Sequence, residues 1–468
     1  MHYVSTRGGS PPLAFDEVLL AGLARDGGLY VPAEWPRLGR ADLGVLAGLS
    51  YAEIAYRVMR PYVGGRIDDD ALATLVEDSY RDFGHRAVAP LKQLGPELWL
   101  MELFHGPTLA FKDYALQLVG RLFDHVLARR GARVTIVGAT SGDTGSAAIE
   151  ACRDRSSIDI FILHPEGRVS DVQRRQMTTV PSANVYNLAI QGTFDDCQAL
   201  VKGLFNDLNF RDRYQLSAVN SINWARIMAQ IVYYVAAAVA LGAPRRKVSF
   251  TVPTGNFGNV FAAYAARMMG LPIDRLVIAS NRNDILTRLL ESGSMKVGTV
   301  EPSLSPSMDI QVSSNFERLL FELCLRQEAE VVELMEQFRR DGVFELSPGA
   351  RRRLGRQFTG GRADDAHTLA AITETYRTTG ELVDPHTAVG LSVAETVPHD
   401  PGVPMVALAC AHPAKFPDAV ERATGVRPAL PARLADLLSR PERLVVLPNR
   451  LDEIRAYIAG RVARAGAA

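Results

Sequence analysis

Lysine is scarce in this chain of 468 residues, although positive charge is not. Only six of the 52 cationic side chains are lysines: Lys92, Lys112, Lys202, Lys247, Lys296 and Lys415. Arginine keeps its proton in a protein, whereas a lysine amine can lose it and form a Schiff base. A position that needs a nucleophilic amine therefore cannot change to arginine, and each remaining lysine becomes a candidate for such chemistry.

Cysteine, net charge and long apolar runs are also in short supply. The few cysteines have no CxxC spacing, which argues against a disulfide framework or a zinc site: Cys152, Cys197, Cys324 and Cys410. Cationic and anionic residues balance at 52 each, which argues against a general polyanion binder. The longest apolar run, 231–243, is shorter than the roughly 18 to 20 residues of a membrane span, and no signal peptide is evident. We expect a soluble cytoplasmic protein with no metal, nucleic-acid or membrane partner.

Short β-branched runs alternate with helical patterns from residue 97 onwards. Buried strands are predicted at 133–139, 157–165, 247–253 and 404–413, with helical periodicity between them. Repeated alternation of this kind predicts an α/β fold with parallel sheets and right-handed crossovers. The first 95 residues are instead predicted to be mainly helical.

Two loops that follow predicted strands are rich in glycine and small polar residues. They are ATSGDTGSAA at 139–148 and PTGNFGNVF at 253–261. Each leads into a helix, where free amide groups and the helix dipole favour an anion. The alternative, a tight turn whose polar residues cap the helix, is equally compatible with either loop. Neither loop has the spacing of a P-loop or of GxGxxG, which excludes those two nucleotide motifs.

Two cationic residues near these loops have competing interpretations. Lys112, in HGPTLAFKD, is either a nucleophilic amine or an exposed lysine paired with Asp113. Arg226, in NSINWARI, either clamps a phosphate or pairs with a nearby carboxylate, and the residues alone favour the pairing. Two anion cradles and one lysine suggest two anionic groups on either side of an amine-reactive centre. A cofactor phosphate and a substrate phosphate or carboxylate would satisfy that pattern.

Seven segments in a fixed order resemble the threonine synthase family, pyridoxal-phosphate enzymes of the tryptophan-synthase-β fold group. The first is an N-terminal block, STRG together with GLARDGGLYVP, and the other six are HGPTLAFKD, SGDTG, NSINWAR, PTGNFGN, SPSMDIQVSSNFERLLFE and AHPAKF. The N-terminal block is similar to the longer, fungal and proteobacterial type.

The resemblance implies two parallel-sheet α/β domains of fold type II, preceded by an additional, mainly helical N-terminal domain. The N-terminal domain is expected at 1–95. The cofactor-binding α/β core is expected at 96–300 and contains the smaller sheet domain at about 133–220. Residues 301–468 are expected to supply a helical insertion and to complete the large domain.

The resemblance also assigns cofactor contacts. Lys112 is expected to form the Schiff base with pyridoxal 5'-phosphate, and Asp143 to lie near the phenolic oxygen of the cofactor. The cofactor phosphate is expected to be wrapped by Gly255, Asn256, Phe257, Gly258 and Asn259.

Cys410 departs from the family pattern, because relatives usually have serine or threonine there, facing the pyridine nitrogen. A thiol is a weaker hydrogen-bonding partner. A small buried core residue is the competing interpretation of Cys410.

The implied substrate is O-phospho-L-homoserine. Its carboxylate and phosphate are expected to meet Thr140, Ser141 and Thr144, and its phosphate to meet Asn220 and Arg226. The implied activity is a γ-elimination of phosphate followed by β-addition of water, which gives L-threonine and phosphate in a carbon–oxygen lyase of the cytoplasm. The alternatives are a lyase that stops at 2-oxobutyrate and a non-catalytic phosphometabolite-binding protein. The resemblance favours a monomer.

Overall fold

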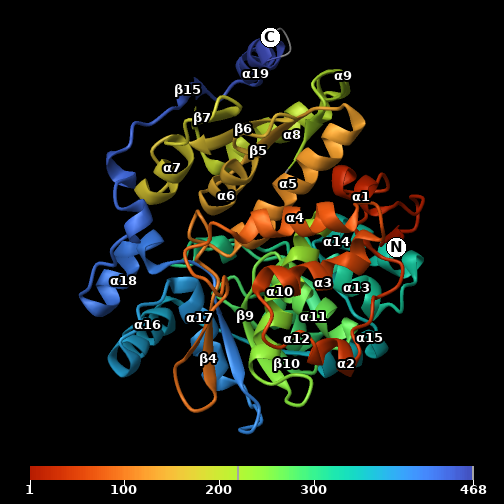
Figure 1. Cartoon of the computed structure of the whole chain (residues 1–468), viewed down its shortest axis with the longest axis vertical. Coiled ribbons are helices and arrows are strands. Elements are labelled where there is room, and N and C mark those ends of the chain that lie inside the picture. Colours follow the sequence, from red (N-terminus) through yellow and green to blue (C-terminus); the bar gives the residue numbers. More distant parts are fainter. Residues whose placement is uncertain (219–220, 466–468) are drawn as a thin grey trace. The chain divides into compact units, whose positions relative to one another are not determined.

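The computed structural model describes residues 1–218 and 221–465, and Figure 1 shows its elements. The chain divides into two units. Unit 1 comprises Met1–Phe111 and Ser221–Pro428, and unit 2 comprises Lys112–Asn220 and Ala429–Ala468. Asn220, predicted to contact the substrate, lies outside the described residues. No helix among the described residues is long and apolar enough to cross a membrane.

Unit 1 is built on a six-stranded sheet. Its strand order is β13 (Phe358–Arg362), β10 (Ile273–Ser280), β9 (Val248–Pro253), β14 (Met405–Ala409), β4 (Leu98–Glu102) and β3 (Leu91–Gln93). All pairs are parallel except β3 with β4. Every residue of β9 and β14 is buried, as expected for strands covered on both faces. The α/β class with parallel sheets is confirmed.

Helices account for most of the rest of unit 1. They are α1 (Phe15–Ala21), α2 (Arg40–Gly44), α3 (Tyr51–Val63), α4 (Asp69–Tyr80), α10 (Trp224–Ala240), α11 (Gly258–Met269), α12 (Ile285–Ser292), α13 (Phe316–Leu323), α14 (Glu328–Asp341), α15 (Pro348–Gln357), α16 (Asp365–Thr379), α17 (Pro385–Thr396) and α18 (Pro417–Thr424). Two short antiparallel pairs accompany them, β1 (Tyr3–Ser5) with β2 (Tyr30–Pro32) and β11 (Ser294–Lys296) with β12 (Val343–Glu345).

Helix α10 is buried on nearly all sides, because its sequence is apolar all round rather than on one stripe. Asn223 caps it, with its side-chain oxygen accepting from the Ala225 amide. The helix contacts both α3 and α11. This burial carries Arg226, in its first turn, into the interior of unit 1.

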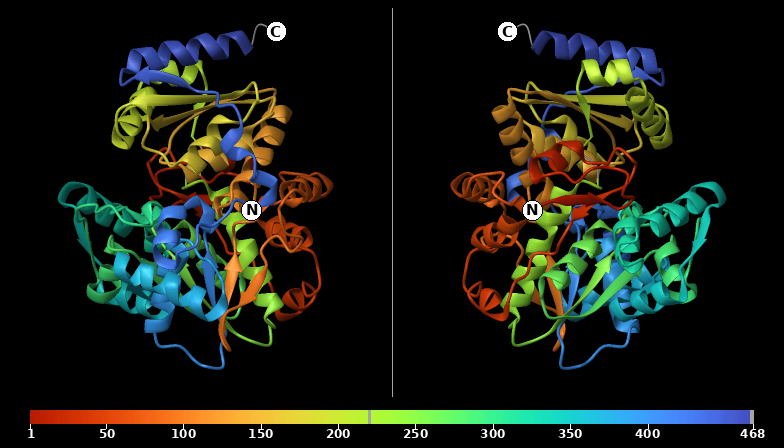
Figure 2. Two further views of the ribbon diagram at one scale, coloured as in Figure 1. Left: turned by 90° about the vertical axis from the view of Figure 1, so that its left-hand side faces the viewer. Right: turned by 90° about the vertical axis from the view of Figure 1, so that its right-hand side faces the viewer.

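Unit 2 contains a five-stranded parallel sheet. Its order is β15 (Val445–Pro448), β7 (Val185–Gln191), β6 (Ile158–Pro165), β5 (Val134–Ala139) and β8 (Leu216–Ser217). Its helices are α5 (Lys112–Arg130), α6 (Asp143–Cys152), α7 (Asp171–Thr178), α8 (Phe194–Asn206), α9 (Leu208–Arg213) and α19 (Leu451–Ala465). In Figure 2 the C-terminal helix α19 lies along this unit, and its residues Ile454 and Ile458 join Leu200 and Leu204 of α8 in one apolar cluster.

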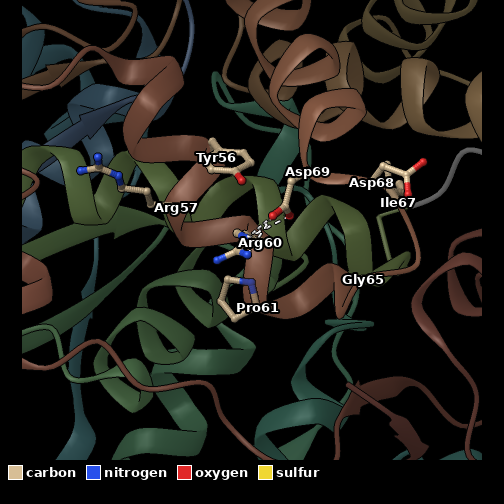
Figure 3. Close-up of a pocket in the computed structure, with 8 residues that line it drawn as sticks. All are labelled: Tyr56, Arg57, Arg60, Pro61, Gly65, Ile67, Asp68 and Asp69. Carbon is tan, nitrogen blue, oxygen red and sulfur yellow. Dashed lines mark hydrogen bonds and ion pairs between the residues drawn. The ribbon is translucent and has the colours of Figure 1, made fainter.

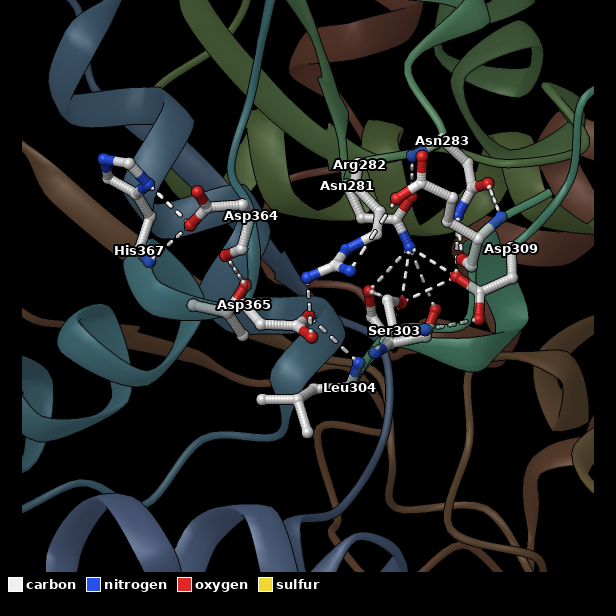
Figure 4. A network of polar contacts seen from close by, with 12 residues as sticks. Asn281, Arg282, Asn283, Ser303, Leu304, Asp309, Asp364, Asp365 and His367 are labelled. Carbon is white, nitrogen blue, oxygen red and sulfur yellow. Dashed lines mark hydrogen bonds and ion pairs between the residues drawn. The ribbon is translucent and has the colours of Figure 1, made fainter. Parts of the chain in front are cut away.

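A polar network fixes the segment after β10 (Figure 4). The Asn281 side-chain amide donates to Ser303 Oγ, Ser305 Oγ and Asp309 Oδ1 at 2.8–3.0 Å. Asp309 also accepts from the Ser303 amide at 2.9 Å. Ser307 and Met308, which lie between Ser305 and Asp309, pack against Gly255, so the network stabilises one wall of the 253–261 loop.

Candidate active site

Lys112 is the first residue of α5 in unit 2, and its side chain is buried, with 8% of the residue exposed. Its Nζ donates to Asp143 Oδ2 at 3.4 Å. The other carboxylate oxygen of Asp143 accepts from Gln173 Nε2 at 2.8 Å. The interpretation as an exposed lysine is therefore wrong. The structure brings Lys112 and Asp143 together, and it adds Gln173, for which the sequence carried no signal.

The loop between β5 and α6 is shaped from within by Thr140. Its Oγ1 is buried and accepts from the amides of Gly142 and Gly145 at 3.0 and 2.9 Å. A Cβ at Gly145 would lie 2.4 Å from Thr140 Cγ2, so this glycine is required by close approach. Ser141 is exposed and Thr144 is half-buried. The hydroxyls of Ser141 and Thr144 are thus the more accessible ones.

The loop between β9 and α11 in unit 1 turns at Phe257, which has a positive φ of 64°. The Phe257 ring is buried between Phe316 and Phe358, with centroids 5.2 and 5.8 Å away. The carbonyl of Gly255 accepts from Ser313 Oγ at 2.5 Å. The Phe257 ring and the Gly255 carbonyl are therefore occupied by contacts within the protein. The first backbone amides of α11 are the groups suited to an anion.

The side-chain amide of Asn259 is buried at the start of α11. Its Oδ1 accepts from the hydroxyls of Tyr233 and Tyr234 at 2.5 and 2.7 Å, which fixes the orientation of the amide. Its Nδ2 is buried and has no acceptor among the described residues. Such a donor is normally satisfied, so it points to a ligand atom.

Arg226 is a buried cation in the first turn of α10. It is 4% exposed, and its Nε and Nη1 are buried without a hydrogen-bond partner among the described residues. Burial lowers the pKa of Arg226 to about 10. Pairing with a carboxylate would have satisfied these nitrogens, so that interpretation does not fit Nε and Nη1. A buried cation of this kind requires an anion.

Two hollows elsewhere in unit 1 each contain an arginine that is paired with a carboxylate. One, of about 630 Å³, is drawn in Figure 3; in it Arg60 is paired with Asp69 at 2.8 Å. The other, of about 760 Å³, contains Arg7, which is paired with Glu317 at 2.8 Å. Both of these guanidinium groups are neutralised by a carboxylate.

Cys410 directly follows β14 and is buried. Its amide donates to Thr387 Oγ1 at 3.1 Å, and its thiol lies 3.7 Å from the Leu408 carbonyl, to which it donates. Both interpretations of this residue, a core thiol and a group facing the cofactor nitrogen, are compatible with this position.

The residues in both units suit pyridoxal phosphate, which needs an amine for its aldehyde and donors for its phosphate. Unit 2 supplies a buried lysine beside a carboxylate, and unit 1 supplies helix amides and the unpartnered Nδ2 of Asn259. A parallel α/β fold with such a lysine and phosphate cradle defines a class, the pyridoxal-phosphate enzymes. The family model described as "Pyridoxal-phosphate dependent enzyme" matches residues 85–347.

Comparisons over the whole chain narrow this class to one family. "Threonine synthase N terminus" matches residues 2–80 and "Threonine synthase, C-terminal" matches 387–458. A threonine synthase of Pseudomonas aeruginosa is 56% identical, covering 98% of each chain. The structure of pyridoxal-phosphate-bound threonine synthase from Brucella melitensis is 54% identical with a TM-score of 0.98, covering 99% of each chain. Yeast threonine synthase is 39% identical with a TM-score of 0.95, also covering 99% of each chain.

The chain belongs to the threonine synthase family. Membership confirms the predicted fold type, the cofactor pyridoxal 5'-phosphate and the threonine synthase activity on a small-molecule substrate. The lyase that stops at 2-oxobutyrate and the non-catalytic binder are not favoured.

Proposed function

We propose that this chain removes phosphate from O-phospho-L-homoserine by γ-elimination and adds water at Cβ, releasing L-threonine. The observation that carries the choice of a phosphorylated substrate is the buried guanidinium of Arg226, whose Nε and Nη1 have no partner among the described residues. An uncharged substrate would leave that cation uncompensated. The reaction is that of a carbon–oxygen lyase acting on a phosphate.

We assign roles to the residues around the cofactor as follows. Lys112 would supply the amine for its aldehyde, and residues 255–259 would hold its phosphate through backbone amides and Asn259 Nδ2. Asp143 would face its phenolic oxygen, and Cys410 its ring nitrogen. When bound, pyridoxal phosphate disperses the negative charge that develops at the substrate carbon losing a proton.

The substrate is handled by the chain itself. Arg226 and Asn220 bind its phosphate, and Thr140, Ser141 and Thr144 bind its carboxylate and phosphate. Once released, the Lys112 amine takes the proton from Cα, and Asp143 orients this amine through the contact at 3.4 Å. Arg226 then stabilises the departing phosphate through charge-assisted hydrogen bonds.

The test is a product analysis with O-phospho-L-homoserine and pyridoxal phosphate. We expect phosphate and L-threonine in equal amounts, and no turnover with homoserine, which lacks the phosphate. 2-Oxobutyrate as the main product would instead identify a lyase that fails to add water. No release of phosphate at all would contradict the proposal.

We also propose a monomeric enzyme of the cytoplasm. All four cysteines are free and buried, as expected where thiols stay reduced. Sedimentation equilibrium of the holoenzyme tests the oligomeric state, and a mass above 51.1 kDa would contradict the monomer.

A further inference from the structure

Asn315 lies in the segment SPSMDIQVSSNFERLLFE, directly before α13, and is fully buried. Its Nδ2 donates to two carbonyls, those of Ser221 at 3.2 Å and Asn256 at 3.1 Å. Its backbone amide also donates to the Asn256 carbonyl at 3.1 Å. One residue therefore joins the loop that leads to Arg226 with the loop predicted to hold the cofactor phosphate.

Arg318 fixes the orientation of the Asn315 amide. Its Nη1 donates to Asn315 Oδ1, so Nδ2 must face the two carbonyls. The same guanidinium donates through Nη2 to the Ile222 carbonyl and through Nε to the Tyr30 carbonyl. It also lies over the Trp224 ring, 5.8 Å from the centroid.

All of these contacts to the two loops are made to carbonyl oxygens. Ser313 adds a third point, because its hydroxyl donates to the Gly255 carbonyl at 2.5 Å. Fixing the carbonyls of successive peptide units on one side leaves their amide groups available on the other side. A phosphate held by amides requires that arrangement before the ligand arrives, because preorganised donors lose no free energy in reorienting.

We propose that Asn315, oriented by Arg318, is a positioning residue that holds the cofactor-phosphate loop and the Arg226 loop in register, so that both phosphate sites form together. This inference rests on the proposed roles of residues 255–259 and Arg226. It assigns to Ser313 a narrower role, because Ser313 would fix only the shape of the cofactor-phosphate loop. The long segment 305–322 thereby acquires a function that involves no contact with the reacting atoms.

The test uses Asn315→Asp, which keeps the shape and the acceptor for Arg318 but replaces the donor Nδ2 by an oxygen facing two carbonyls. Two quantities are measured: the affinity of the resolved enzyme for pyridoxal phosphate, by absorbance and fluorescence titration, and KM for O-phospho-L-homoserine in the reconstituted enzyme. We expect both to worsen about tenfold or more, since two buried hydrogen bonds are lost. An unchanged affinity for the cofactor together with an unchanged KM would overturn the inference.

The matched control is Asn187→Asp in unit 2. Asn187 is also buried, and its Nδ2 also donates to two carbonyls, those of Met177 and Arg443. We expect this variant to lose thermal stability while keeping both the cofactor affinity and KM. If it shifts them as much as Asn315→Asp does, the effect is general destabilisation and the inference fails.

Two further variants test the positioning role of Asn315 separately from the proposed role of Arg226. Ser313→Ala should weaken binding of pyridoxal phosphate and leave KM unchanged. This variant replaces Asn315→Asp as the test if Asn315→Asp does not fold. An affinity for the cofactor equal to that of the unmodified enzyme would contradict the inference that these side chains shape the cofactor-phosphate loop. Arg226→Met tests the proposed function directly through KM. In a chain that already carries Arg226→Met, Asn315→Asp should no longer raise KM but should still weaken cofactor binding. If Arg226→Met alone leaves KM unchanged, the proposed role of Arg226 fails; if it raises KM and Asn315→Asp does not, only the positioning role fails.

Discussion

Replacing Arg226 with methionine should weaken substrate binding without lowering the stability of the enzyme. Burial lowers the pKa of Arg226 to about 10, well below the usual range of a guanidinium. At 1.36 kcal/mol per pKa unit, this corresponds to roughly 3 kcal/mol spent on keeping the charge in a dry environment. Methionine has a similar length and no charge. The free energy of unfolding of the substrate-free enzyme, measured in urea, should therefore stay the same or increase by up to about 3 kcal/mol.

The same substitution should strongly impair binding of the phosphorylated substrate. Nε and Nη1 are two donors for charge-assisted hydrogen bonds, worth about 1.5–3 kcal/mol each. Their loss should raise KM for O-phospho-L-homoserine by about a hundredfold or more. Urea unfolding followed by circular dichroism gives the stability, and phosphate release at varied substrate concentration gives KM.

Arg318→Met is the matched comparison. Arg318 is also fully buried, and burial lowers its pKa to about 9. It donates, however, to the backbone carbonyls of Tyr30 and Ile222 and to the side-chain Oδ1 of Asn315. Its removal should destabilise the enzyme by about 3–5 kcal/mol, because these acceptors lose their donor. If Arg226→Met destabilises the enzyme as much as Arg318→Met, Arg226 is structural and the reasoning is refuted.

Four further outcomes can be checked. Lys112→Ala should abolish threonine formation and the covalent attachment of pyridoxal phosphate, which reduction with borohydride and mass spectrometry detect; attachment at another lysine would contradict its role. Gly145→Ala should destabilise the enzyme by about 1–3 kcal/mol in urea, because the new Cβ meets Thr140 Cγ2 at 2.4 Å; a midpoint equal to that of the unmodified enzyme would argue against this close approach. Burial lowers the pKa of Arg226 only to about 10, so its guanidinium stays charged at neutral pH and KM should stay flat between pH 7 and 9; a steep rise of KM within that range would argue against this. Burial raises the pKa of Cys152 to about 12, so iodoacetamide at pH 8 should leave it unlabelled in the folded enzyme and label it in urea.

Local patterns in the sequence were sufficient for the elements that carry the site. The strand predicted at 133–139 is β5 (Val134–Ala139), and that at 247–253 is β9 (Val248–Pro253). The alternation of strands and helices and the position of the two glycine-rich loops depend only on neighbouring residues. The resemblance of the quoted segments added the cofactor and the family, which periodicity and composition do not encode.

Some elements had no readable local signal. Strand β13 (Phe358–Arg362), at the edge of the unit 1 sheet, contains two glycines in FTGGR and was not predicted as a strand. Its place depends on β10, because it pairs with Leu276–Ser280. Strand β15 does have a local strand signal in ERLVVLP, but nothing in that run predicts its pairing with β7, more than two hundred residues earlier in the chain. Such pairings are decided by which surfaces meet, and a single strand carries little information about its partner.

Residue types alone set which chemical groups are available, above all a rare lysine, an arginine at the start of an apolar helix and two loops able to hold anions. How those groups are used depends on the folded structure. It buried Arg226 with no partner among the described residues for Nε and Nη1, and it turned the Thr140 hydroxyl towards the amides of its own loop. It also placed Asn315 between carbonyls 94 and 59 residues away in the chain. The reason is physical: the residue type limits what a side chain can donate or accept, whereas burial and partners depend on contacts between distant segments that form only when the chain is folded.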